Sequence, residues 1–418
     1  MASIHPIDTE KEKTDRIEDP NNRNSHRELK NRLPEPGTPE RIATERKLVR
    51  KLDRRVLPTI IVIYAMNNID RSGITTARLQ GLEDDLHLTS ASSSSASSVR
   101  PCAKLFPGIQ YSVILSAIYV TYCPAQVPSN MILNHITRPS LYIGACVVAW
   151  GLTSAMTGLT RNFGGIMACR IFLGLPEAAF YPGAIYLLSR WYTKKELAFR
   201  SAILYGGLMI SNAFGALMAA GILAGMEGKR GIRAWRWLFF IEVGRAFAIQ
   251  HPIVDGLCAI WLLPDYPCNT RWLSPVDCRL AQARLSDDAG EADQDNESDS
   301  PFHGLKLAIT DPKVLLFALM SCVQLLGLGF SIFFPTLTAT LGFSTTVTLV
   351  LAAPPWILAT ALCYLNAWHA DRTGERYFHI VGWWWGTILG YIIALSTNYT
   401  AARYVSLFLM TFGYVGAA

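Results

Sequence analysis

The chain has 418 residues, of which 50% are hydrophobic and only 17% charged, with a formal net charge of +6 at pH 7. A soluble protein usually carries about 25% charged residues, so this composition argues against a soluble globular class. Apolar runs of about 20 residues recur along the chain and predict a helical protein that crosses a bilayer many times. The positive charge lies beside these runs, which indicates membrane topology, and no nucleic-acid partner is expected.

Residues 1–48 are rich in charged residues, Asn and Pro, which predicts a disordered tail. A basic run from Arg46 to Arg55 joins the tail to the first span, so the positive-inside rule predicts a cytoplasmic N-terminus. The same basic stretch could also bind anionic lipid.

The predicted N-terminal half, residues 49–263, holds six spans. These lie near residues 56–76, 111–133, 141–159, 167–192, 201–226 and 237–263. A Ser-rich run at 91–106 between the first two spans is expected to be a flexible loop. The sixth span is irregular, because residues 244–256 would place four polar side chains at membrane depth: Arg245, Gln250, His251 and Asp255.

An acidic segment, residues 264–312, follows as a predicted cytoplasmic linker. The C-terminal half, residues 313–418, holds four predicted spans near 314–337, 345–367, 378–395 and from 401 onward. The expected fold is therefore an all-α polytopic membrane protein, with six spans, a linker and an incomplete second half of about four spans.

Charged residues within the spans are the strongest indication of function. Arg170 and Glu177 are seven residues apart in the fourth span and therefore share one helix face. Asp70 and Arg71 are adjacent near the end of the first span. An ionisable residue inside a membrane is costly and usually faces a partner or a polar path. A static pair between Arg170 and Glu177 that only holds the helix in the bundle is the structural alternative.

Enzymatic motifs are missing from the sequence, which contains no G-x-S-x-G, P-loop or Cys/His metal spacing. The nine cysteines mostly lie in apolar runs and are expected to be small buried hydrophobes. No enzyme activity, cofactor or metal site is therefore expected.

Several stretches together resemble one family. They are KLVRKLDRRVLP before the first span, NIDRSGITTARL within it, YCPAQVPSN in the second, RIFLGLPEAAFYPGAIYLLSRWYTKKELAFR in and after the fourth, RAWRWLFFIE before the sixth and LLPDYPCNTRWL at the start of the linker. From about residue 46 onward, the chain resembles the fungal anion:cation symporters of the major facilitator superfamily, the allantoate permease and nicotinate transporter family. The resemblance implies proton-coupled uptake of a small organic anion, such as a carboxylate vitamin or a ureide, through the plasma membrane.

The resemblance also assigns residues to a central cavity. It implies that Arg71, Tyr122 and Arg170 bind the substrate, because arginine stays charged and holds a carboxylate with two hydrogen bonds. It implies that Asp70 and Glu177 couple protons, with Glu177 expected near Arg170 and Asp70 beside Arg71. The loop AWHADRTGERY resembles the superfamily's gating motif, and its matching positions are Asp371, Arg372, Gly374 and Arg376.

Departures from the family pattern leave two alternatives open. The runs at 91–106 and 244–256 resemble insertions from retained introns, the first-half gating loop NHITRPSLY lacks its Asp, and two spans of the expected twelve are missing. The chain could therefore be the inactive product of a truncated gene model. It could also be a nutrient sensor that binds its ligand without transporting it.

Overall fold

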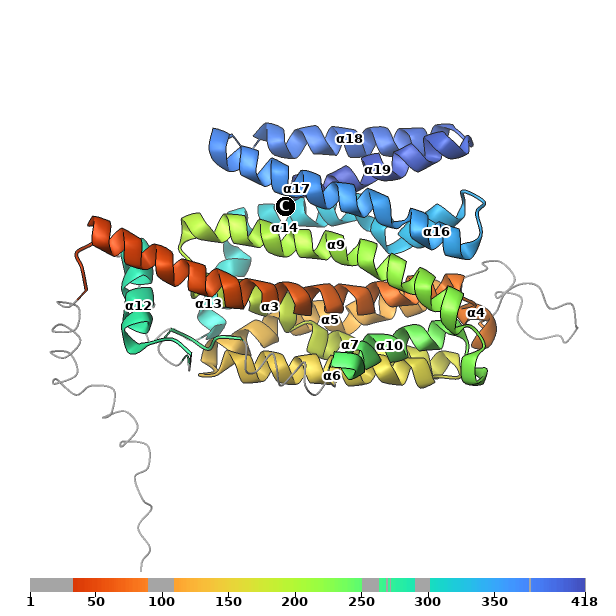
Figure 1. Cartoon of the computed structure of the whole chain (residues 1–418), viewed down its shortest axis with the longest axis horizontal. Coiled ribbons are helices and arrows are strands. Elements are labelled where there is room, and N and C mark those ends of the chain that lie inside the picture. Colours follow the sequence, from red (N-terminus) through yellow and green to blue (C-terminus); the bar gives the residue numbers. More distant parts are fainter. Residues whose placement is uncertain are drawn as a thin grey trace, which may run out of the picture.

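The computed structural model describes residues 33–88, 109–249, 263–267, 270, 272–289, 301–375 and 377–417. Every regular element within these ranges is a helix. The long helices run side by side along one elongated bundle, with the latest segments of the chain in its uppermost layer (Figure 1). The prediction of an all-helical architecture is confirmed for the described residues.

The first helix, α3 (Pro39–Leu79), is 41 residues long and extends well beyond the predicted first span. The Thr38 side chain accepts a hydrogen bond from the backbone of Arg41, and Pro39 occupies a favoured first position, so the helix begins here. Residues 39–48, which we expected in the disordered tail, are therefore helical. Apolar side chains four residues apart bury the extension against the bundle: Leu48, Leu52, Val56 and Ile60.

Seven further α-helices of the N-terminal part lie within the described residues. They are α4 (Leu82–Asp85), α5 (Ile109–His135), α6 (Pro139–Leu159), α7 (Phe163–Glu177), α8 (Phe180–Ser189), α9 (Lys194–Met226) and α10 (Ala234–Ile249). The fourth predicted span is two helices, because α7 ends at Glu177 directly after Pro176, which lacks a backbone donor. The Ser-rich run at 91–106 lies outside the described residues, as do Gln250, His251 and Asp255.

The predicted linker is partly helical and contains α12 (Pro275–Ala289) and α13 (Pro301–Thr310). The C-terminal helices follow it as α14 (Pro312–Gly327), α15 (Phe334–Ala339), α16 (Thr345–Leu351), α17 (Ala353–Thr373), α18 (Tyr377–Ser396) and α19 (Thr400–Ala417). A short 3-10 turn, Gly329–Phe333, separates α14 from α15.

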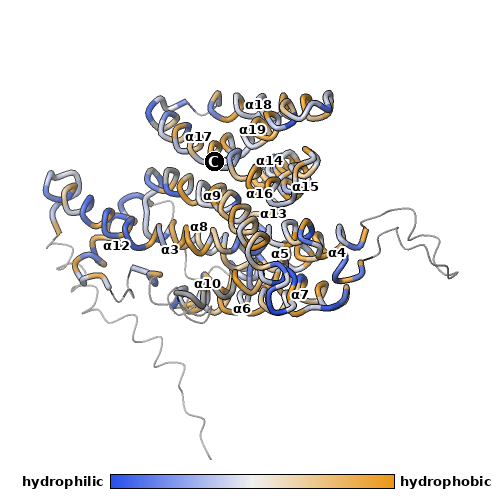
Figure 2. Tube along the Cα trace, turned by 45° about the vertical axis from the view of Figure 1, so that its right-hand side comes forward, coloured by the Kyte–Doolittle hydropathy of each residue, from blue (hydrophilic) through white to orange (hydrophobic). Residues whose placement is uncertain are grey.

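Six stretches of the described residues are long and apolar enough to cross a membrane. They are Pro139–Leu159, Phe163–Ser189, Arg200–Met226, Pro312–Ala339, Thr345–Ala370 and Tyr377–Ser396. The other four predicted spans correspond to α3, α5, α10 and α19, which are helical but fall outside that measure of length and hydropathy. Apolar segments fill the middle of the bundle, and hydrophilic segments gather at α12 and at the start of α3 (Figure 2).

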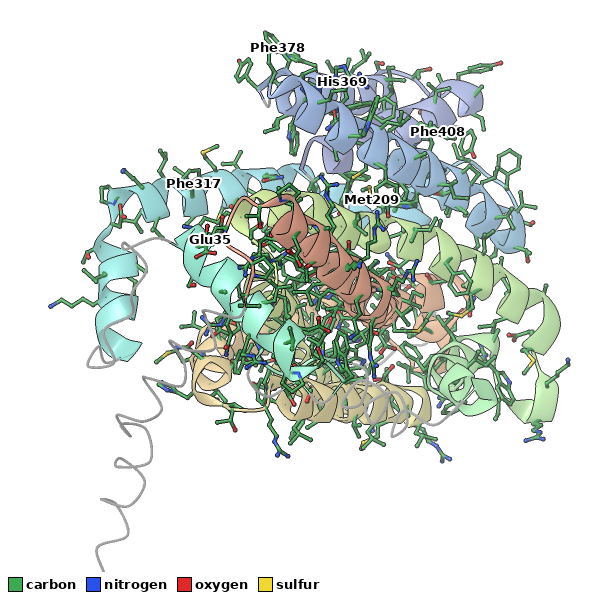
Figure 3. The ribbon with its side chains drawn as sticks, turned by 60° about the vertical axis from the view of Figure 1, so that its left-hand side comes forward. Glu35, Met209, Phe317, His369, Phe378 and Phe408 are labelled. Atoms are coloured by element: carbon green, nitrogen blue, oxygen red, sulfur yellow. The ribbon has the colours of Figure 1, made fainter. Side chains whose placement is uncertain are left out.

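Most outward-facing side chains of α14 are apolar, as a lipid-facing helix requires. Phe317 is 66% exposed and Leu326 is 80% exposed. Figure 3 shows Phe317 projecting away from the other helices. The exposed face is thus suited to contact with acyl chains rather than with water.

The two sets of helices meet mainly where α9 packs on α16 and α17. Met209 of α9 is fully buried and lies on the side of the helix that faces the C-terminal helices (Figure 3). Gly206 admits the phenol of Tyr364 from α17, because a Cβ atom at this position would overlap with that ring. This α9–α17 contact is the seam between the two sets.

Polar contacts dock α12 against the N-terminal helices, at what we call the linker end of the bundle (left in Figure 1). Arg284 is only 5% exposed and donates to the Glu196 carboxylate at 3.1 Å and to the Trp191 carbonyl at 2.7 Å. Nearby, Asp53 of α3 accepts hydrogen bonds from Arg200 and from the Tyr192 hydroxyl.

Candidate functional site

The candidate site is centred on an ion pair between α3 and α7. Arg71 donates through Nε to Glu177 Oε1 at 2.8 Å, and its Nη2 lies 2.7 Å from the same oxygen. The Glu177 side chain is 2% exposed, whereas that of Arg71 remains 28% exposed. Glu177 is therefore enclosed, while the guanidinium retains access to a ligand.

The second carboxylate oxygen of Glu177 is in a different situation. Oε2 is buried and has no hydrogen-bond partner among the described residues. A buried polar atom without a partner is costly and calls for a functional or structural explanation. Because a carboxylic acid carries its proton on one oxygen, Oε2 offers a position for a proton that leaves the contact of Oε1 in place.

Tyr122 of α5 completes this group. The guanidinium carbon of Arg71 lies 4.4 Å from the centre of the Tyr122 ring, which places the cation over the ring face. Tyr119, one turn earlier, meets Tyr122 edge-on with ring centres 6.4 Å apart. The sequence analysis expected Tyr122 near the substrate, and the structure places its ring against the substrate-binding candidate Arg71.

Close contact between α5 and α7 positions Tyr122 relative to Glu177. A Cβ atom at Gly174 would lie 2.9 Å from the Tyr122 backbone nitrogen and 2.5 Å from the Ile118 carbonyl oxygen. The Thr121 hydroxyl crosses the same contact and donates to the Ile171 carbonyl at 2.6 Å. Glycine at position 174 therefore allows the two helices to approach.

The remaining two predicted cavity residues point to other neighbours. Asp70 accepts a hydrogen bond from the Ser154 hydroxyl of α6 at 2.6 Å. Arg170 is 2% exposed on α7 and lies within electrostatic reach of Tyr111 on α5. The structure thus joins Arg71, Tyr122 and Glu177 directly, whereas Asp70 bonds to α6 and Arg170 lies two turns before Glu177 on α7.

Several polar and aromatic residues near this group were not singled out from the sequence. Tyr64 of α3 stacks on Tyr181 of α8 with ring centres 5.3 Å apart. Their position within predicted spans could have indicated a role at the site, because a phenol hydroxyl in an apolar setting normally needs a hydrogen-bond partner. Asn68 of α3 was also missed, and its amide donates to Ser211 and Asn212 of α9 at 2.8 and 2.7 Å.

The predicted gating residues lie where α17 ends, at the linker end of the bundle (Figure 1). Gly374 has a φ of +72° and ends the helix in the left-handed conformation that glycine adopts without strain. Arg372 lies over the Trp368 ring at 5.5 Å. The Asp371 side chain and Arg376 lie outside the described set.

Within the described ranges, no cluster of three or more His, Cys, Asp or Glu side chains is arranged to hold a metal ion. We therefore assign no residue to a metal or cofactor. The chemistry of the group is that of ion pairing: a cation that binds anions, a carboxylate that accepts protons, and an aromatic face that stabilises the cation.

Comparison with known proteins identifies the family of the chain. The family model described as Major Facilitator Superfamily matches residues 60–418. The chain is 31% identical over 390 residues to the MFS-type transporter cnsO of Penicillium expansum, covering 90% of this chain and 70% of that protein. It is 26% identical over 393 residues to the major facilitator-type transporter hxnP of Emericella nidulans, covering 90% and 73%.

Solved structures support the fold. The chain is similar to the xylose transporter XylE from E. coli in a partially occluded inward-open conformation, with a TM-score of 0.59 at 12% identity, covering 86% of this chain and 84% of that one. It is also similar to a bacterial homologue of the human lysosomal transporter Spinster, with a TM-score of 0.58 at 18% identity, covering 87% and 73%. The chain is a multi-pass membrane transporter rather than an enzyme, and it belongs to the Major Facilitator Superfamily.

Proposed function

We propose that this chain is a secondary active transporter of the anion:cation symporter group, which takes up a small organic anion together with protons. The arrangement that carries the proposal is the Arg71–Glu177 pair, in which one carboxylate oxygen is held and the other is buried without a partner. An anion importer needs both a cation for the substrate and a group that loads a proton, and here the two are in direct contact.

The coupling step follows from competition for one guanidinium. While Glu177 is ionised, it occupies the Nε and Nη2 positions of Arg71. A proton on Oε2 removes the negative charge, weakens the ion pair and frees the guanidinium to bind a substrate carboxylate. Loss of the proton restores the pair and expels the anion, so substrate and proton bind and leave together.

The overall cycle is alternating access, in which two sets of helices rock about a site near the membrane midplane. We place substrate binding at Arg71, Tyr122 and Arg170, proton coupling at Glu177 and Asp70, and gating at the loop that contains Asp371, Arg372, Gly374 and Arg376. The basic start of α3 supports a cytoplasmic N-terminus, and uptake of a nutrient anion suits the plasma membrane.

Replacing Glu177 by Gln tests the proposal. The substrate is found first, by measuring uptake of labelled nicotinate, allantoate, pantothenate and biotin by wild-type chain in cells that lack their own carriers. Glu177→Gln keeps the shape but cannot load a proton, so we expect normal surface expression and loss of the stimulation of uptake by external acid. Acid-stimulated uptake that persists in this variant would contradict the proton role.

A matched control is available in a second Arg–Glu pair, which joins α3 to α4. Arg78 of α3 pairs with Glu83 at 2.9 Å, and both side chains are more than a quarter exposed. Glu83→Gln removes an Arg–Glu pair away from the candidate site, so it should leave acid-stimulated uptake intact. Ligand binding without accumulation in the wild-type chain would favour a sensor instead of a transporter.

A further inference from the structure

Two histidines meet at the linker end of the C-terminal helices. His369 Nδ1 of α17 lies 2.6 Å from His379 Nε2 of α18, and the ring centres are 4.9 Å apart. Figure 3 shows His369 beside the start of α18, where Phe378 is labelled. The two positions flank the turn between α17 and α18, so their hydrogen bond closes the two ends of that turn.

The surroundings of the pair determine which nitrogen carries the proton. His379 Nδ1 is buried and has no hydrogen-bond partner among the described residues, whereas His369 is exposed. A buried N–H without an acceptor is rarer and costlier than a buried lone pair. His379 therefore carries its hydrogen on Nε2 and donates to His369 Nδ1, and His369 carries its own hydrogen on the outer nitrogen.

An added proton can go to either ring. On His379 Nδ1 it would keep the bond but create a buried cationic N–H without an acceptor, which is costly. On the exposed His369 it occupies Nδ1 and faces the Nε2–H of His379, donor against donor, so the bond is lost. We propose that His369 and His379 form a proton-sensitive latch, closed while both imidazoles are neutral and opened when His369 is protonated.

The latch is distinct from a second, non-titrating connection one turn deeper. The Asn366 amide donates to the carbonyls of His379 and Val415 at 3.3 and 3.4 Å, and its oxygen accepts from the Trp383 indole at 2.8 Å. Asn366 thus connects α17, α18 and α19 at any pH. Protonation should release only the last turn of α17 and the first turn of α18, which border the 371–376 loop.

Few other charges lie on α17, on α18 or on the helices packed against them. Arg372 and Glu375 lie on the same turn and are exposed, and the Asp371 side chain lies outside the described set. The described residues of α18 add no Lys, Arg, Asp or Glu, and α19 adds only Arg403, near its opposite end. On α9, Glu196 forms an ion pair with Arg284. Arg200 forms an ion pair with Asp53, and Lys194 is exposed.

Hydrogen–deuterium exchange of the full chain in lipid nanodiscs tests the latch directly. Exchange of peptides covering 369–380 is compared between about pH 7.5 and about pH 5.5, the range in which histidine changes charge, after correction for the chemical effect of pH. Loss of one hydrogen bond should raise the opening equilibrium of these peptides by about 2- to 10-fold at acid pH. Peptides around Asn366 toward the middle of α17 should stay unchanged.

Variants separate the latch from a general acid effect. His369→Asn with His379→Gln places amide groups at the two bonding positions, so the bond persists without titration and the acid step should vanish. His369→Ala should leave the turn open at both pH values. His135→Asn alters an exposed histidine at the end of α5 and should behave as wild type.

Two results would overturn the latch: wild-type exchange that is equal at both pH values, or an acid step that survives in the double amide variant. Because neither result involves substrate or Glu177, the latch and the proposed transport function can fail separately.

Discussion

At the scale of single residues, both nitrogens that Arg71 uses converge on one oxygen of Glu177. A guanidinium normally matches two acceptor oxygens side by side. A substrate carboxylate can therefore offer Arg71 a better geometry than Glu177 does, once Glu177 is neutralised. The pair is thus suited to exchange of partners rather than to permanent stabilisation.

Arg71→Lys tests the need for this geometry. Lysine keeps the charge but presents a single point donor instead of a planar fork. We expect uptake of the anion to fall by about tenfold or more, equivalent to ~1.4 kcal/mol, while surface expression is kept. Arg78→Lys, which alters the partly buried pair between α3 and α4, should transport normally. Uptake by Arg71→Lys equal to wild type would show that charge alone suffices.

Replacing Tyr122 separates its ring from its hydroxyl. Because Arg71 lies over the ring face, Tyr122→Phe keeps the cation–π contact, worth ~0.5–2 kcal/mol, and Tyr122→Leu removes it. We expect a near-normal KM for the Phe variant and a clearly raised KM for the Leu variant in uptake assays. Equal impairment of both would instead assign the role to the hydroxyl.

The types of residue at the site could be predicted from the sequence, because ionisable groups within apolar spans are easily recognised. The residues with which they pair could not be predicted from the sequence. Glu177 was expected beside Arg170 on its own helix, whereas the structure bonds it to Arg71, 106 residues away in sequence. Helical periodicity orders side chains along one helix, but the pairing of two helices depends on packing that single-sequence patterns do not encode.

At the scale of elements, the apolar runs predicted where helices lie, and their ends were less predictable. The sequence did not predict where α3 begins, because the segment is highly charged. Its buried residues Leu48, Leu52 and Val56 are separated by basic residues. The break between α7 and α8 had a visible signal in Pro176, although proline is tolerated in membrane helices. This break leaves Glu177 as the last residue of α7.

Gly174→Ala tests whether the α5–α7 contact positions the site. The added methyl group would collide with backbone atoms of Ile118 and Tyr122, and overpacking of this kind costs ~1–3 kcal/mol. We expect a lower thermal unfolding temperature together with weaker substrate binding. Gly221→Ala on α9, where nothing lies within 4 Å, should be neutral or stabilising. An unfolding temperature unchanged in Gly174→Ala would refute the close contact.

At the scale of the whole molecule, transport requires the seam between α9 and α17 to open and close. Gly206→Val would place a branched side chain where the Tyr364 phenol packs, so it should disfavour the conformation described here. We expect uptake to fall by at least about tenfold in a protein that still elutes as a folded monodisperse species. Gly221→Val on the same helix is the control, and comparable losses in both would point to a helix-propensity effect.

Coupled movement of protons and substrate is the most direct test of the central claim. The purified chain is reconstituted in liposomes that contain a pH-sensitive dye, the membrane potential is clamped at zero, and the anion identified by uptake is added outside. Substrate entry should acidify the lumen in wild type, and Glu177→Gln should abolish this acidification. Substrate accumulation without proton entry, or undiminished proton entry in Glu177→Gln, would contradict the exchange of Arg71 between Glu177 and the substrate.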